Sequence, residues 1–127
     1  METAVLVAQL EAAELDAGQF DHRAHVRAAW HYLNVLPLPE AAHRFAAVLQ
    51  AYVRRLSAQE KFHLTLTLAF MHLIHQRMHA GESWDRFSAR YPELFRDAGK
   101  LINRHYSPQA LERGRREFAE PDLAALP

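Results

Sequence analysis

Three histidines occupy positions from which imidazole groups could bind a metal ion. His22 and His25 are three residues apart in FDHRAHVRAAW (20–30), and His63 lies in the nearly apolar run KFHLTLTLAF (61–70). Side chains at i and i+3 share one side of a helix, and a third imidazole from a neighbouring helix completes a set of three nitrogens. Catalytic zinc takes three such ligands and leaves one position open, and iron or copper also accepts imidazole. The sequence therefore predicts a divalent metal ion, preferably zinc, bound by these three histidines.

The expected helical faces turn these histidines inward. A helix over 21–36 places His22 and His25 on or beside its apolar stripe, whereas His31 falls among the arginines. In the later helix, His63 shares a face with Thr67, Phe70 and Ile74. An unpaired buried imidazole costs about 1–3 kcal/mol, so these side chains need either hydrogen-bond partners or a metal. Both explanations stay open at this level.

A second histidine cluster, HLIHQRMH (72–79), also has one-turn spacings. His72 and His79 fall on the face that carries Thr65 and Gln76, with His75 at its border, which indicates a solvated surface. A metal carrier or sensor that uses His72, His75 and His79 is the hypothesis this cluster supports.

An open position on the metal would hold a water molecule or a substrate. The metal would acidify that water, while Tyr106 and Glu60 are the candidates for handling protons. Both residues also have structural interpretations. Tyr106 with Ser107 fits an aromatic anchor and a helix cap before proline, and Glu60 fits a capping box that begins at Ser57.

The elements that must position these residues are expected to be helices. The sequence predicts them over 3–15, 21–36, 39–56, 58–79, 83–90 and 108–118. Asp21 and Ser83 are expected to cap two of them, and Pro39 suits the first turn of a third. Strand-like alternation is confined to HLTLTL (63–68), inside an apolar stretch too long for a typical strand. This pattern predicts an all-α, compact helical bundle of about four main helices.

The last ten residues, FAEPDLAALP, are too interrupted by proline for a helix and too apolar for a loose tail. We expect an extended C-terminal strap with Leu123 and Leu126 docked on the bundle. A chain of 127 residues is long enough for one core, so residues 1–127 are predicted to form a single helical domain.

Composition narrows the function classes. Fifteen basic residues balance fifteen acidic ones, so the sequence predicts no binding to nucleic acid. Cysteine is absent, which excludes disulfides and thiolate ligands. No apolar run is long enough to span a membrane and no secretory leader is present, which together predict a soluble cytoplasmic protein. Nine histidines are many for this length.

The order of four short motifs resembles that of a group of small bacterial all-helical proteins of uncharacterised activity. The motifs are F-x-H-x-x-H, an aromatic residue followed by H-x-T-x-T, a Tyr-Ser pair, and a closing P-D-L-x-x-L-P. They fall here on Phe20, His22 and His25; on Phe62, His63, Thr65 and Thr67; on Tyr106 and Ser107; and on Pro121, Asp122, Leu123, Leu126 and Pro127. The resemblance covers residue 20 to the end and selects the same three histidines, but it implies no substrate.

Three functions follow from the residues. The first is a small metalloenzyme that acts on a small-molecule substrate through the three-histidine site. The second is a non-catalytic helical interaction or accessory module, in which the buried histidines are structural and the chain forms a homodimer. The third is the metal carrier or sensor described above.

Overall fold

The computed structural model describes all 127 residues, and every regular element in it is a helix. The all-α prediction is confirmed, because 66% of the chain is helical and no strand is present. The chain divides into two compact units, residues 1–62 and 63–127. None of the helices combines the length and the apolar character that a membrane-spanning segment requires.

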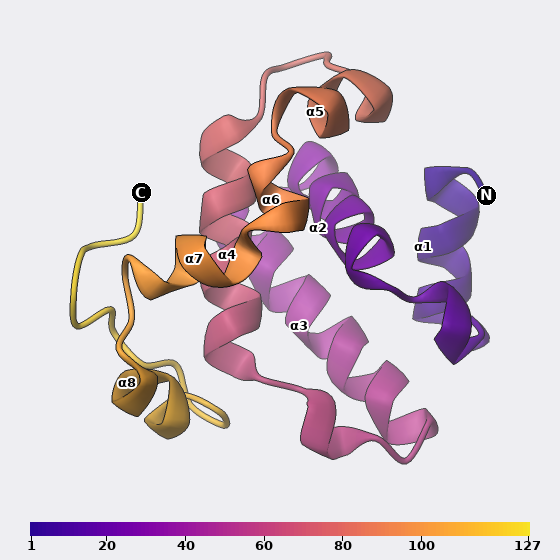
Figure 1. Ribbon diagram of the computed structural model, residues 1–127. Helices are drawn as coiled ribbons and strands as arrows, with labels where there is room; N and C mark the ends of the chain where they lie inside the picture. The colour runs from indigo at the N-terminus through magenta and orange to yellow at the C-terminus, as the bar shows by residue number, and fades with distance from the viewer. The chain divides into compact units, whose positions relative to one another are not determined.

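The first unit consists of three helices that pack against one another in pairs (Figure 1). They are α1 (Thr3–Glu11), α2 (His22–Val35) and α3 (Leu38–Arg55), joined and followed by the single-turn helices η1 (Ala17–Gln19) and η2 (Gln59–Lys61). Small side chains are buried on both α2 and α3, which pack against each other; they are Ala28, Ala29, Ala41, Ala42 and Ala46.

Local signals set the helix ends in this unit. The Asp21 carboxylate accepts a hydrogen bond from the Ala24 backbone N–H at 2.9 Å, so the predicted cap of α2 is confirmed. Pro39 lies in the first turn of α3, as predicted. The first helix is shorter than the predicted range 3–15, because Ala13 adopts a left-handed backbone conformation with φ of 55°.

The second unit contains five helices. They are α4 (Leu64–Arg77), α5 (Trp84–Arg90), α6 (Glu93–Arg96), α7 (Ala98–Asn103) and α8 (Pro108–Arg113). Helix α7 packs against both α4 and α6. The sequence pattern predicted neither α6 nor α7. The Ser83 and Ser107 side chains cap α5 and α8, each accepting a hydrogen bond from the backbone N–H three residues later.

The predicted helix over 58–79 is wrong at both ends. Helix α4 begins at Leu64 and ends at Arg77. The proposed capping box is also wrong, because Ser57 has a φ of 54° and Glu60 lies in η2. The side chain that caps α4 is that of His63, whose Nδ1 accepts a hydrogen bond from the Leu66 N–H at 3.1 Å.

The C-terminal segment, residues 114–127, is an extended strap without helix or strand, drawn in yellow in Figure 1. This agrees with the prediction, although α8 ends five residues before the predicted 118. The predicted docking of Leu123 is wrong, since 59% of this residue is exposed. Leu126 is half-buried. The strap is therefore held by something other than the apolar side chain at 123.

Candidate functional site

His63 is fully engaged in hydrogen bonds inside the second unit. Its Nδ1 accepts from the Leu66 backbone, and its Nε2 lies 2.8 Å from the carbonyl oxygen of Leu111. The first bond requires an unprotonated Nδ1, so the proton is on Nε2, which donates to the carbonyl. One imidazole thus begins α4 and joins it to α8. A metal ion could use His63 only after one of these bonds had broken.

Thr65 and Thr67, which follow His63, also have structural partners. The Thr67 hydroxyl donates to the His63 carbonyl at 2.8 Å. The Thr65 hydroxyl accepts from the Ala119 N–H at 2.9 Å and donates to the Glu117 carbonyl at 3.2 Å. The face of α4 that carries Thr65 was predicted to be solvated, but Thr65 is completely buried. The strap lies over this face, and the polar side chains there satisfy backbone groups that would otherwise be buried without partners.

Tyr106 also holds the strap at Ala119. The phenol is 1% exposed and donates to the carbonyl oxygen of Ala119 at 2.9 Å. Burial, reinforced by the nearby carboxylates of Glu120 and Asp122, raises the pKa of Tyr106 to about 12. Its proton is already in use and hard to remove, so the geometry favours the anchoring role over the acid–base role.

Asp122 completes the attachment of the strap. One carboxylate oxygen accepts from the Ser107 N–H at 2.8 Å, and the other accepts from the Ser107 hydroxyl. These two bonds hold the pKa of Asp122 below its ordinary value. Residues of the H-x-T, Tyr-Ser and P-D-L motifs thus hold the strap by hydrogen bonds, and we call this set the strap clasp: Thr65, Tyr106, Ser107 and Asp122.

His22 and His25 belong to the first unit, on the first turn of α2. Their rings are nearly parallel, 12° apart, with centroids separated by 6.2 Å. The expectation that His22 faces inward is wrong, because this residue, at the very start of α2, is exposed. The His25 ring does lie against Phe20 and Phe45, at centroid distances of 5.8 and 5.1 Å. The His25 Nδ1 is buried without a hydrogen-bond partner. Burial, together with the neighbouring His22, lowers the pKa of His25 to about 4, so the imidazole is neutral at pH 7.

No group of three or more His, Cys, Asp or Glu side chains in the structure could hold a metal ion. The three predicted ligands are divided between the units, two in the first and His63 in the second. Glu60, the predicted proton carrier, is exposed in η2 of the first unit. The three-histidine site and its catalytic residues stay a prediction.

The later histidines are separated by the end of α4. His72 and His75 lie on the helix, but His79 comes after its last residue, so helical spacing does not align the three. The His72 Nδ1 donates to the Pro127 carbonyl at 3.2 Å, and the His79 Nε2 lies 3.2 Å from both the Tyr91 hydroxyl and an Arg90 nitrogen. Two of the three imidazoles therefore have partners in different parts of the unit.

The second unit also contains a groove of about 450 Å³ that the sequence did not indicate. Its apolar lining comes from α4, α7 and the strap: Leu73, Leu101, Ala124, Ala125 and Pro127. Its polar lining consists of Gln76, Arg77, Arg104 and His105, with no acidic side chain. No helix was predicted over 91–107, so the faces of Arg104 and His105 could not be assigned from the sequence.

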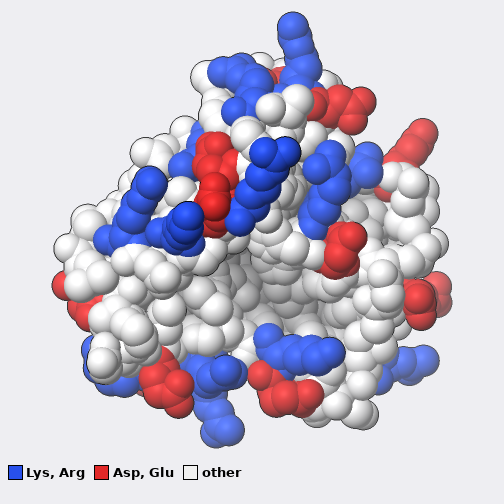
Figure 2. All heavy atoms as spheres, in the orientation of Figure 1, with Lys and Arg blue, Asp and Glu red and all other residues white.

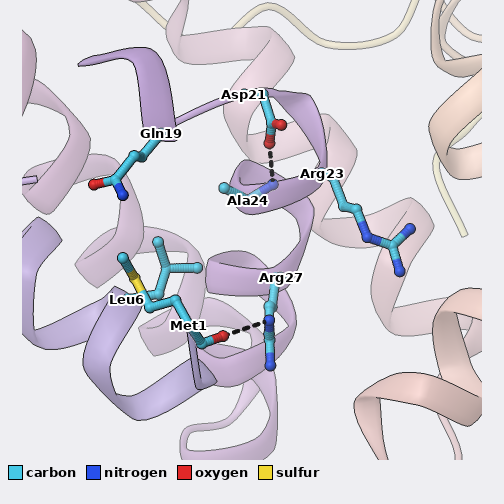
Figure 3. A pocket seen from close by; sticks show the side chains of 7 residues that line it. All are labelled: Met1, Leu6, Gln19, Asp21, Arg23, Ala24 and Arg27. Carbon is cyan, nitrogen blue, oxygen red and sulfur yellow. Dashed lines mark hydrogen bonds between the residues drawn. The ribbon is translucent and has the colours of Figure 1, made fainter. Parts of the chain in front are cut away.

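A smaller hollow of about 280 Å³ lies in the first unit, where α1 meets the start of α2 (Figure 3). Its charged groups are already used by the fold. Asp21 caps α2, and Arg27 donates to the Met1 carbonyl at 2.9 Å and to the Thr3 hydroxyl at 2.6 Å. This hollow is therefore a weaker candidate for ligand binding than the groove.

On the face drawn in Figure 2, acidic side chains lie among the basic ones, in keeping with their equal numbers. No model of a known protein family, no curated protein and no solved structure matches the chain.

Proposed function

We propose that this chain is a non-catalytic helical binding module, and that the groove of the second unit is its ligand-binding site. The observation that carries the proposal is the groove itself, about 450 Å³ with an apolar lining and a basic polar rim. Small-molecule sites are typically concave, of about 300–1,000 Å³, and mostly apolar with a few orienting polar groups. The groove has this composition.

The state of the candidate catalytic residues supports a binding role. His63 uses both ring nitrogens within the fold, and the Tyr106 proton is donated to the strap. His63 joins α4 to α8, and Tyr106 holds the strap, which in turn supplies one wall of the groove through Ala124, Ala125 and Pro127. Residues with reactive functional groups thus shape the binding site without entering it.

The proposal is tested by an NMR screen of small amphipathic compounds against the isotope-labelled full chain. Binding should shift the amide signals of Gln76, Leu101 and Ala125, and each compound should be recovered chemically unchanged. Shifts confined to α1 and the start of α2, or conversion of a compound, would contradict the proposal.

A second candidate is metal binding by His22 and His25, favoured by the unpaired, neutral Nδ1 of His25. Metal ions bind the unprotonated imidazole, and the lowered pKa of His25 keeps this ring unprotonated at pH 7. Metal content should be measured on protein purified without a histidine tag. Near-stoichiometric zinc, iron or copper that is lost in His25→Ala and kept in His79→Ala would support this candidate. Metal-free protein would contradict it, and only the binding-module proposal would then stand.

A further inference from the structure

We infer that the ligand of the groove is a small monocarboxylate with an apolar tail, an inference that rests on the proposed function. The two basic side chains at the rim differ in how they are used. The Arg77 Nε lies 3.2 Å from the Glu93 carboxylate, and its Nη1 donates to the Leu73 carbonyl at 2.8 Å. Its charge is therefore largely compensated within the unit.

Arg104 has no such compensation. It is exposed at the end of α7, and its guanidinium has neither an ion pair nor a hydrogen bond within the molecule. No acidic side chain lines the groove. A guanidinium presents parallel N–H groups that match the two oxygens of a carboxylate. The rim thus offers one unpaired cation, which suits an anion with a single charged group.

His105, next to Arg104, holds the strap side of the groove. Its Nδ1 donates to the Ala124 carbonyl at 2.9 Å, so Nε2 of the neutral ring is an acceptor and offers no donor to a carboxylate. The Gln76 amide on α4 also lines the groove and carries both donors and an acceptor. The Arg104 guanidinium and the Gln76 amide can orient the carboxylate of a ligand, whereas Leu73, Leu101 and Ala125 offer only apolar surface. An apolar tail is the part of a ligand that such surface accepts.

Ligand binding should also order the strap. The wall formed by residues 124–127 is attached through His105, whose carbonyl accepts from the Leu123 N–H at 3.0 Å, and through His72, which bonds to Pro127. Leu123 is exposed and Leu126 is only half-buried, so these hydrogen bonds contribute to fixing this part of the strap. A tail lying against Ala124 and Ala125 adds apolar contacts to that wall and should slow hydrogen exchange of the Leu123 N–H.

The test compares octanoate with octanamide, which has the same tail and no charge, by NMR titration of the full chain. Octanoate should bind at least several-fold more tightly than octanamide at pH 7. Arg104→Gln should weaken octanoate binding about tenfold, the usual scale for a hydrogen bond to a charged group, and leave octanamide binding unchanged. Arg104→Lys should keep part of the affinity. Arg86→Gln, an exposed arginine on α5 outside the groove, is the matched control and should bind like the native chain.

The outcomes separate the inference from the proposed function. Equal binding of octanoate and octanamide in the groove, unaffected by Arg104→Gln, would overturn the carboxylate inference and leave the binding module standing. Binding of neither compound, together with no shift from any compound in the wider screen, would overturn both. Octanoate binding that is lost equally in Arg86→Gln would show general charge attraction and would also overturn the assignment to Arg104.

Discussion

His25→Leu is expected to make the protein less sensitive to acid. Below pH 6.5 the unfolded chain takes up a proton on His25, whereas in the folded protein the pKa is lowered to about 4. Proton binding to the unfolded state lowers the free energy of unfolding as the pH falls. The contribution of neutral His25 to the free energy of unfolding is therefore fully present above pH 6.5. It is lost progressively as the pH falls from 6.5 to 4, and it changes no further below pH 4.

The magnitude follows from the difference between the two pKa values. The full shift corresponds to about 3 kcal/mol, since one pKa unit is worth about 1.4 kcal/mol. At pH 5 the linkage relation gives about 2 kcal/mol of that loss. Leucine cannot titrate, so the variant avoids this part of the acid destabilisation. The cause is local, because the ring lies against Phe20 and Phe45 and its Nδ1 has no hydrogen-bond partner.

The assay is urea unfolding of the native chain and the variant at pH 7 and pH 5. Leucine also changes packing, but that contribution is the same at both pH values, so only the change in the native–variant difference is informative. This difference should move by about 2 kcal/mol in favour of the variant at pH 5. His43→Leu, at an exposed position on α3, is the control and should follow the native chain. A pH-independent difference for His25→Leu would refute the reasoning.

Three further predictions concern the strap clasp. Thr65→Val should lower the free energy of unfolding by about 1–3 kcal/mol in urea, because the Ala119 N–H and the Glu117 carbonyl lose their partner, and it should speed hydrogen exchange at Ala119. Gly114→Ala should cost about 1–3 kcal/mol by thermal or urea unfolding, since a Cβ there would overlap the Thr65 side chain; an unchanged stability would contradict the close packing. Tyr106→Phe should cost about 0.5–1.5 kcal/mol in urea and leave ligand shifts in the groove in place, whereas abolished binding would indicate a direct role for the phenol.

Helix class and several helix ends were predictable because their determinants are local. Asp21, Ser83 and Ser107 each accept a hydrogen bond from the backbone three residues later, so a short stretch of sequence contains both partners. The start of α4 was missed, because its cap is a histidine, which is not among the residues that usually cap helices, and because other partners are distant. Its first backbone N–H groups, at Leu64 and Thr65, donate to carbonyls of the strap about fifty residues away.

The short helices α6 and α7 escaped prediction for a related reason. Helices of four and six residues are too short to be stable from intrinsic propensity, so packing against neighbours must stabilise them. Their positions decide where Arg104 and His105 lie, and thus the rim of the groove. Sequence patterns that report amphipathic faces are too weak over such lengths to locate these residues.

By itself, the sequence determined that the chain is helical, where most of the long helices begin, and that His25 and His63 face inward or take partners. Only the tertiary structure decided what those partners are. The Nε2 of His63 donates to Leu111 and the Tyr106 hydroxyl donates to Ala119, in both cases to backbone carbonyls. Every residue has a backbone carbonyl, so the sequence does not indicate which carbonyl the fold brings within reach of a given side chain. The chemistry of a histidine or a tyrosine, in contrast, is known from the residue type alone.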